Sequence, residues 1–229
     1  MGNLSEFLME ELNVATAFTI PIFGGIEVAE STVISWVIMA IIVILTLVLT
    51  RNMRVEKPGK LQVGVEYAVT ALQNLVRGII GHEGERYVPY LSTVLVFLGI
   101  SNIFAIFGMK PPTKDLNVTA ALALMSIILV QAASIRQNKV GGWLKGFTKP
   151  SKVITPLNVM ELAIRPLSLC MRLFGNVMGA FVVMKLLEHL VPVILPAVFS
   201  LYFDFFDGLL QAYVFVFLPG LYIKEAVEE

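Results

Sequence analysis

The chain has 229 residues, of which 57% are apolar and only 15% are charged. Soluble domains carry about 25% charged residues, and a mean hydropathy of +0.81 implies more apolar surface than a water-soluble fold hides. The 17 basic and 17 acidic side chains balance, so no net field attracts nucleic acid, and the single cysteine, Cys170, excludes a disulfide scaffold. The composition predicts an all-α polytopic membrane protein.

The first 30 residues contain five glutamates and no lysine or arginine. They lack the basic start of a secretory signal. Because basic residues mark the cytoplasmic side, we expect residues 1–30 to form an extracytoplasmic N-terminal segment. The remainder, residues 31–229, is expected to be a single membrane-embedded domain.

Apolar runs long enough to cross about 30 Å of hydrocarbon predict about five crossings. They cover residues 32–50, 90–109, 118–135, 156–190 and 193–223. The last two runs exceed the roughly 20 residues of an upright crossing, which predicts a hairpin of steeply tilted or bent helices. Residues 61–80 mix polar and apolar side chains at helical spacing, as in a helix that lies on the membrane surface.

Basic residues indicate the orientation of the chain. The loop at 51–89 holds six of them and the loop at 136–152 holds five, whereas the turn at 110–115 holds two. Because basic loops stay in the cytoplasm, we expect the N-terminus outside and the C-terminus inside.

Charged residues inside the penultimate run are informative because each costs about 2.5–3.5 kcal/mol at the bilayer centre. At about 100° per residue, one stripe within about 40° of Arg172 holds Glu161, Arg165, Ser168 and Asn176. Arg172 has no carboxylate three or four residues away, which favours a functional role. Two pairs have plainer interpretations: Glu161 with Arg165 as an ion pair, and Lys185 with Glu188 as an interfacial pair.

The last run repeats this pattern. Asp204, Asp207, Gln211 and Ser200 fall on one face of the predicted helix. Two polar stripes that face each other, or face a third partner, would line a water-accessible path for ions. Polar side chains also hold membrane helices together, at about 0.6 kcal/mol each, so a structural role for these residues stays open.

Four segments resemble subunit a of the F-type ATP synthases, the stationary ion-channel subunit of the membrane sector. The most specific is PLSLCMRLFGN at residues 166–176. The others are PTKDLNVT at 112–119, PLNVME at 156–161 and QAYVF at 211–215.

The resemblance implies a subunit that is not an enzyme by itself, needs no cofactor and sits in the bacterial plasma membrane. Its partners would be a rotating c-ring, the peripheral-stalk b subunits and lipid. Two offset half-channels would lead H⁺ or Na⁺ to and from the ring carboxylates, and Arg172 occupies the position of the essential arginine. Asn176 and Gln211 match positions around that arginine, and Glu161 matches an acidic residue near the cytoplasmic entrance.

The chain departs from the family pattern at two positions. Many members carry Glu where this chain has Phe181, and His or Glu where it has Asp204. We therefore expect Asp204 and Asp207 together to supply the acid of the outer half-channel. Carboxylates relay protons or bind sodium, so the coupling ion, and a Na⁺ site at these two residues, stay open.

Two other classes are considered. A stand-alone secondary transporter or ion channel would use the same polar stripes and would transport ions in liposomes by itself. An intramembrane hydrolase would need a nucleophile and base, or metal ligands, that face each other. Asp204 and Asp207 resemble half of an aspartyl pair, but the sequence has no second aspartate motif, and the buried arginine argues against a hydrolase.

Overall fold

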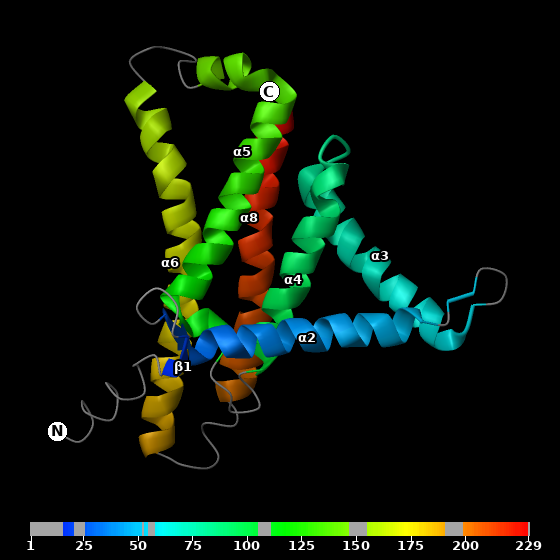
Figure 1. The fold of residues 1–229 in the computed structure, drawn as a ribbon, viewed down its shortest axis with the longest axis vertical. Coiled ribbons are helices and arrows are strands. Elements are labelled where there is room, and N and C mark those ends of the chain that lie inside the picture. Colours follow the sequence, from blue (N-terminus) through cyan, green and yellow to red (C-terminus); the bar gives the residue numbers. More distant parts are fainter. Residues whose placement is uncertain are drawn as a thin grey trace.

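The computed structural model describes residues 16–20, 26–51, 53–54, 58–104, 111–146, 155–190 and 199–228. The described chain is helical apart from one antiparallel hairpin of β1 and β2, which the sequence patterns do not predict. The elements, shown in Figure 1, are β1 Thr16–Ile20, β2 Ile26–Ala29, α2 Glu30–Thr50, α3 Lys60–Ile80, α4 Val88–Ile103, α5 Leu116–Gly146, α6 Thr155–Leu190, the π-helix η5 Leu201–Asp207 and α8 Gly208–Glu228. Short 3₁₀ turns, η1 Glu85–Tyr87 and η3 Pro112–Lys114, precede α4 and α5.

Four helices of the described chain are long and apolar enough to cross a membrane, which confirms the all-α polytopic class. They are α2, α5, α6 and the helix that combines η5 with α8. The amphipathic prediction for 61–80 coincides with α3. The crossing predicted at 90–109 corresponds to α4, which has 16 residues and so spans about 24 Å; residues 105–110 lie outside the described part.

The lengths of α2 and α6 constrain how the molecule lies in a bilayer. With 21 residues, α2 is about 32 Å long, close to the hydrocarbon thickness. With 36 residues, α6 is about 54 Å long. Because α2 runs crosswise to α5, α6 and α8 (Figure 1), these helices cannot all stand along the membrane normal, and the excess length of α6 favours its tilt.

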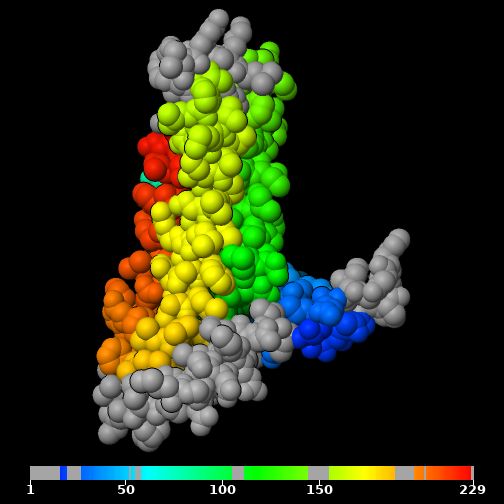
Figure 2. Space-filling model, turned by 90° about the vertical axis from the view of Figure 1, so that its left-hand side faces the viewer, coloured from blue at the N-terminus to red at the C-terminus, as the bar shows by residue number. Residues whose placement is uncertain are grey.

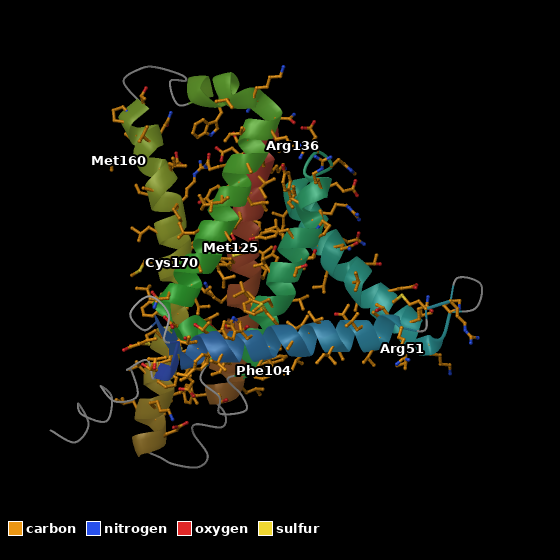
Figure 3. The ribbon with its side chains drawn as sticks, viewed as in Figure 1. Arg51, Phe104, Met125, Arg136, Met160 and Cys170 are labelled. Carbon is orange, nitrogen blue, oxygen red and sulfur yellow. The ribbon has the colours of Figure 1, made fainter. Side chains whose placement is uncertain are left out.

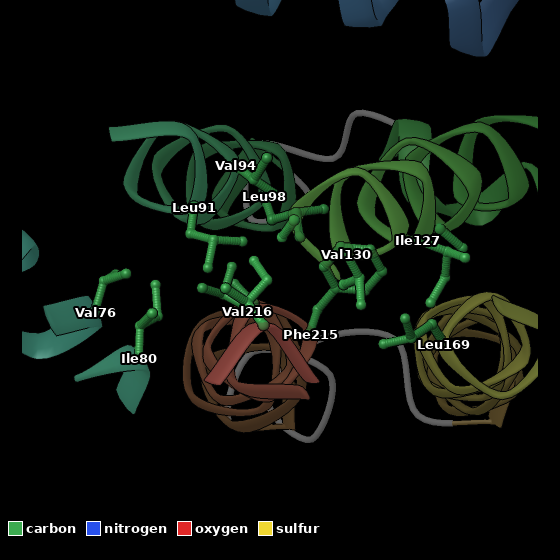
Figure 4. Close-up of a cluster of buried hydrophobic side chains, with 14 of the residues drawn as sticks. Val76, Ile80, Leu91, Val94, Leu98, Ile127, Val130, Leu169, Phe215 and Val216 are labelled. Carbon is green, nitrogen blue, oxygen red and sulfur yellow. The ribbon is translucent and has the colours of Figure 1, made fainter. Parts of the chain in front are cut away.

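The apolar core lies where α8 packs against α3, α4 and α5, and where α5 packs against α6 (Figure 4). Phe215 and Val216 supply the α8 side of this core. Leu98 of α4 and Leu173 of α6 are fully buried within it. Because α8 is covered by three helices and α6 mainly by one, α6 keeps a broad face outside the core.

A buried carboxylate joins α2 to the start of α5. Asp115 directly precedes α5, and its Oδ1 accepts a 2.9 Å hydrogen bond from the backbone N–H of Asn117. This is the bond that a capping aspartate makes to the first helical turn. Its Oδ2 accepts a hydrogen bond from Ser31 Oγ of α2, so one side chain both starts α5 and fixes the beginning of α2.

The far end of α5 bends sharply. Lys139 has φ 54° and ψ 165°, outside the helical region, and two glycines follow it. Trp143 then folds back, and its Nε1 donates a 2.9 Å hydrogen bond to Gln131 Oε1. The crossing predicted at 118–135 is therefore the straight part of a longer element.

Glycine at position 220 of α8 allows a close approach to α3, because a Cβ there would lie 2.9 Å from Ile79 Cγ2. Gly220→Ala should cost about 1 kcal/mol net, through overpacking. Gly78→Ala is the matched control, since no atom lies within 4 Å of its added Cβ, and it should stabilise by about 0.5–1 kcal/mol. Thermal unfolding of the purified protein in detergent measures both effects; equal shifts would contradict the packing described.

Candidate functional site: an arginine face on α6

Helix α6 has one buried and one exposed face. Leu169, Cys170 and Leu173 pack into the core, whereas Leu167 and Met171 are more than half exposed. Figure 3 labels Cys170, two residues before Arg172, in the middle part of the helix. Figure 2 looks onto this helix and shows the middle of its length uncovered. An exposed apolar face on a membrane helix faces lipid or another protein.

Arg172 lies on this exposed face. Its guanidinium makes no hydrogen bond or ion pair with any residue that the structure describes. Two glycines, Gly175 and Gly179, follow it on the same exposed side, and no atom lies within 4 Å of a Cβ built on either. The face around Arg172 is therefore sterically open, with uncharged neighbours one turn away, and it supplies no counter-ion from the described residues.

The structure brings Asn176 and Gln211 together, as expected for facing stripes on α6 and α8. Asn176 Nδ2 donates a 2.7 Å hydrogen bond to Gln211 Oε1. Gln211 is 3% exposed, and its Nε2 is buried without a hydrogen-bond partner among the described residues. A buried donor of this kind marks a place that a water molecule or another polar group would satisfy.

Arg165, two helical turns before Arg172 on the same predicted stripe, has a different environment. It donates to Glu161 Oε1 at 2.8 Å and lies 3.4 Å from Glu225 Oε2 on α8. Its guanidinium carbon also lies 4.4 Å from the centre of the Tyr222 ring. Glu161 and Arg165 thus form the simple ion pair considered from the sequence, extended across to α8. The patterns missed Glu225 and Tyr222 because no periodicity on one helix reveals its partner on another.

The remaining candidates lie toward the other end of α6. Lys185 Nζ lies 3.0 Å from Glu188 Oε2, which is the predicted i,i+3 pair. Lys114 Nζ of η3 lies 3.6 Å from the centre of the Phe181 ring, a contact that the sequence patterns did not predict. Ser168 is exposed and Ser200 is half-buried.

The two aspartates lie in the π-helix that precedes α8. A π-helix closes its hydrogen bonds from residue i to i+5, so each residue turns less than in an α-helix, and single π turns occur often at functional sites. The predicted common face of Asp204, Asp207 and Gln211 assumed α-helical spacing throughout. Asp207 is half-buried, while the Asp204 side chain lies outside the described part, so their shared face stays a prediction.

The class of protein follows from these features. The described chain has four long apolar helices, and a hydrogen bond between polar side chains joins α6 to α8. Arg172 lies on an exposed face of α6. These features define an integral, multi-pass membrane protein with polar groups inside its membrane-spanning helices. Within the described ranges, no three His, Cys, Asp or Glu side chains gather as a metal site.

Comparison with known proteins identifies the family. The family model of the ATP synthase A chain matches residues 32–224. ATP synthase subunit a of Moorella thermoacetica is 37% identical over 205 residues, covering 89% of this chain and 93% of the relative. ATP synthase subunit a 1 of Hahella chejuensis is 33% identical, covering 90% and 87%. The chain belongs to the ATP synthase subunit a family, whose members are ion-translocating components of the membrane sector.

A third relative has a sodium ion in its name. The protein named ATP synthase subunit a, sodium ion specific, of Propionigenium modestum is 30% identical over 219 residues, covering 89% of this chain and 75% of that protein.

The hydrogen bond between Asn176 and Gln211 predicts a measurable coupling. Asn176→Ala and Gln211→Ala should be non-additive by about 0.5–1.5 kcal/mol in the free energy of unfolding, measured in detergent for both single variants and the double variant. Ser168→Ala with Gln211→Ala is the control pair, because Ser168 is exposed and makes no hydrogen bond to the described residues. Additivity in both pairs would contradict the contact.

Proposed function

We propose that this chain is the stator ion channel of a rotary F-type ATP synthase. It passes H⁺ or Na⁺ through two offset half-channels to and from the carboxylates of a rotating c-ring, with Arg172 as the electrostatic gate. The observation that carries the proposal is the exposed guanidinium of Arg172, which has no counter-ion among the described residues. Family membership supports the role of the chain in the membrane sector.

The chemistry of arginine suits this gate. Its guanidinium stays protonated even when removed from water. A fixed positive charge favours the ionised form of a carboxylate that comes close, so a ring carboxylate that arrives opposite Arg172 releases its ion. The same charge repels a cation that moves directly from one half-channel to the other. Gly175 and Gly179 leave room for close approach of a partner helix.

The outer half-channel is proposed to use Asp204 and Asp207 as its acids, with Asn176 and Gln211 between them and the ring. Asp207 is half-buried, and the unsatisfied Nε2 of Gln211 suits an ordered water. Glu161 is proposed to lie near the cytoplasmic entrance, where the ion pair with Arg165 partly compensates the charge of its carboxylate. Four residues would supply secondary polar contacts: Arg165, Ser168, Ser200 and Glu188.

The assembly follows from the same proposal. The tilted hairpin of the last two helices, about 156–190 and 193–223, faces the c-ring, and the peripheral-stalk b subunits hold the chain stationary. The membrane is the bacterial plasma membrane, with residues 1–30 outside and the C-terminus in the cytoplasm. The basic loops at 51–89 and 136–152 support this orientation.

Removal of the gate charge tests the proposal directly. Arg172→Ala should abolish ATP synthesis driven by an ion gradient, while the complex still assembles, because only the charge that controls ion release is lost. The measurement is ATP synthesis in membrane vesicles, corrected for the amount of this chain in the purified complex.

Arg165→Ala is the matched control for that experiment. It removes an arginine from the same helix, but one that is paired with Glu161 and Glu225. It should lower the stability of the complex and leave most of the synthesis per assembled complex. Retained synthesis in Arg172→Ala would refute the gate.

The outer acids are tested by a second change. Asp204→Asn combined with Asp207→Asn should slow ion uptake by about tenfold or more, because amides cannot relay protons. Ion-driven synthesis is measured with and without Na⁺, which also identifies the coupling ion. Glu27→Gln, at an exposed position on β2, is the control, and equal rates in the two variants would assign the aspartates to packing.

A further inference from the structure

A buried polar contact joins α4 to the junction between the π-helix and α8. Asn102 of α4 is 3% exposed, and Thr113 of η3 is fully buried. Asn102 Nδ2 donates a 2.8 Å hydrogen bond to the backbone carbonyl oxygen of Gly208. Thr113 Oγ1 donates a 3.0 Å hydrogen bond to Asn102 Oδ1. One carboxamide thus joins α4 and η3 to Gly208, which lies 106 residues away in the sequence.

The chemistry of these groups determines which atom faces which. A backbone carbonyl only accepts, so the carboxamide must present its nitrogen to Gly208. Its oxygen then faces Thr113, whose hydroxyl donates. The Gly208 carbonyl fixes the orientation of the amide, and the Thr113 hydroxyl, which can donate or accept, donates to the oxygen that this orientation presents. Thr113 thereby supports the rotamer of Asn102 that serves Gly208.

Gly208 is also a point of close approach. A Cβ built on Gly208 would lie 2.9 Å from Asn102 Cβ, closer than real side chains come. The absence of a side chain at Gly208 therefore lets the backbone of α8 approach α4 closely enough for the hydrogen bond to form.

The position of this contact in the chain gives it functional meaning. Gly208 directly follows the π-helix Leu201–Asp207. Its own N–H bonds to the carbonyl oxygen of Phe203, the wide i to i+5 closure, and also to that of Phe205. Because π turns are rare, a contact with a neighbouring helix at such a turn helps select it over a regular α-helical turn. The carbonyl that Asn102 holds belongs to the residue after Asp207.

We propose that Asn102 is a positioning residue for ion uptake: through its hydrogen bonds with Thr113 and the Gly208 carbonyl, it fixes the π-helical turn that carries Asp204 and Asp207. This inference rests on the proposed role of the two aspartates as outer acids. Asn102 acts through the backbone and does not itself bind the ion.

The test uses the assembled complex and distinguishes a positioning role of Asn102 from a role in packing alone. Ion-driven ATP synthesis is measured in vesicles over a range of outer H⁺ concentrations, and in a second series over Na⁺ concentrations, at constant membrane potential. Asn102→Leu, which keeps the volume of the side chain, should raise the ion concentration for half-maximal rate by about three- to tenfold, the range of one lost hydrogen bond.

Ser101→Ala is the matched control. Ser101 is the neighbouring buried residue on α4, and its hydroxyl has no hydrogen-bond partner among the described residues, so its loss should leave the half-maximal concentration unchanged. A purely structural role for Asn102 would lower the maximal rate in proportion to assembled complex without moving that concentration, and this result would overturn the proposal.

Two further variants test the same proposal at the partners of Asn102 and at Asp207. Thr113→Val retains the volume of Thr113 and the hydrogen bond to Gly208 but releases the carboxamide oxygen, so it should produce a smaller shift even where Asn102→Leu fails to assemble. Asp207→Asn should itself raise the half-maximal concentration, and adding Asn102→Leu should then have little further effect.

The outcomes distinguish the two proposals. A shift in Asp207→Asn with none in Asn102→Leu or Thr113→Val rejects only the positioning role. No shift in Asp207→Asn rejects Asp207 as an outer acid, and the positioning role with it.

Discussion

The whole arrangement depends on one uncompensated charge. Arg172 lies in the middle of a long apolar helix, and the described residues of its own chain supply it with no anion. Since an arginine in hydrocarbon costs several kcal/mol, such a side chain requires a partner or a water-filled space beyond the described residues. Its neighbours one turn away are uncharged, and Gly175 and Gly179 leave the face open, which suits contact with another membrane helix.

Two arginines of the same stripe show how tertiary structure divides similar residues into different roles. Arg165 is held by Glu161, by Glu225 and by the face of Tyr222, so its charge is neutralised within the chain and ties α6 to α8. Arg172, seven residues later, has none of these among the described residues. The paired arginine stabilises the contact between two helices, and the other is available to act on a partner.

Helix α8 connects the core to the polar contacts. Its buried face packs on α3, α4 and α5 through Phe215 and Val216, while Gln211 reaches Asn176 of α6. At its start, the π turn is held from α4 by Asn102. The backbone of the π turn is thus tied, through α4 and α8, to the buried core of the molecule.

The sequence by itself determined the class of the protein, because hydropathy and helical periodicity are local: α2, α3 and α6 coincide closely with the predicted runs. It also singled out Arg172, since the lack of a carboxylate one turn away is visible in the chain. Only the tertiary structure decided that Arg165 reaches Glu225, that Asn102 reaches Gly208, and that the aspartates lie in a π turn. These features depend on contacts between distant segments, and α-helical spacing along a single segment carries no information about them.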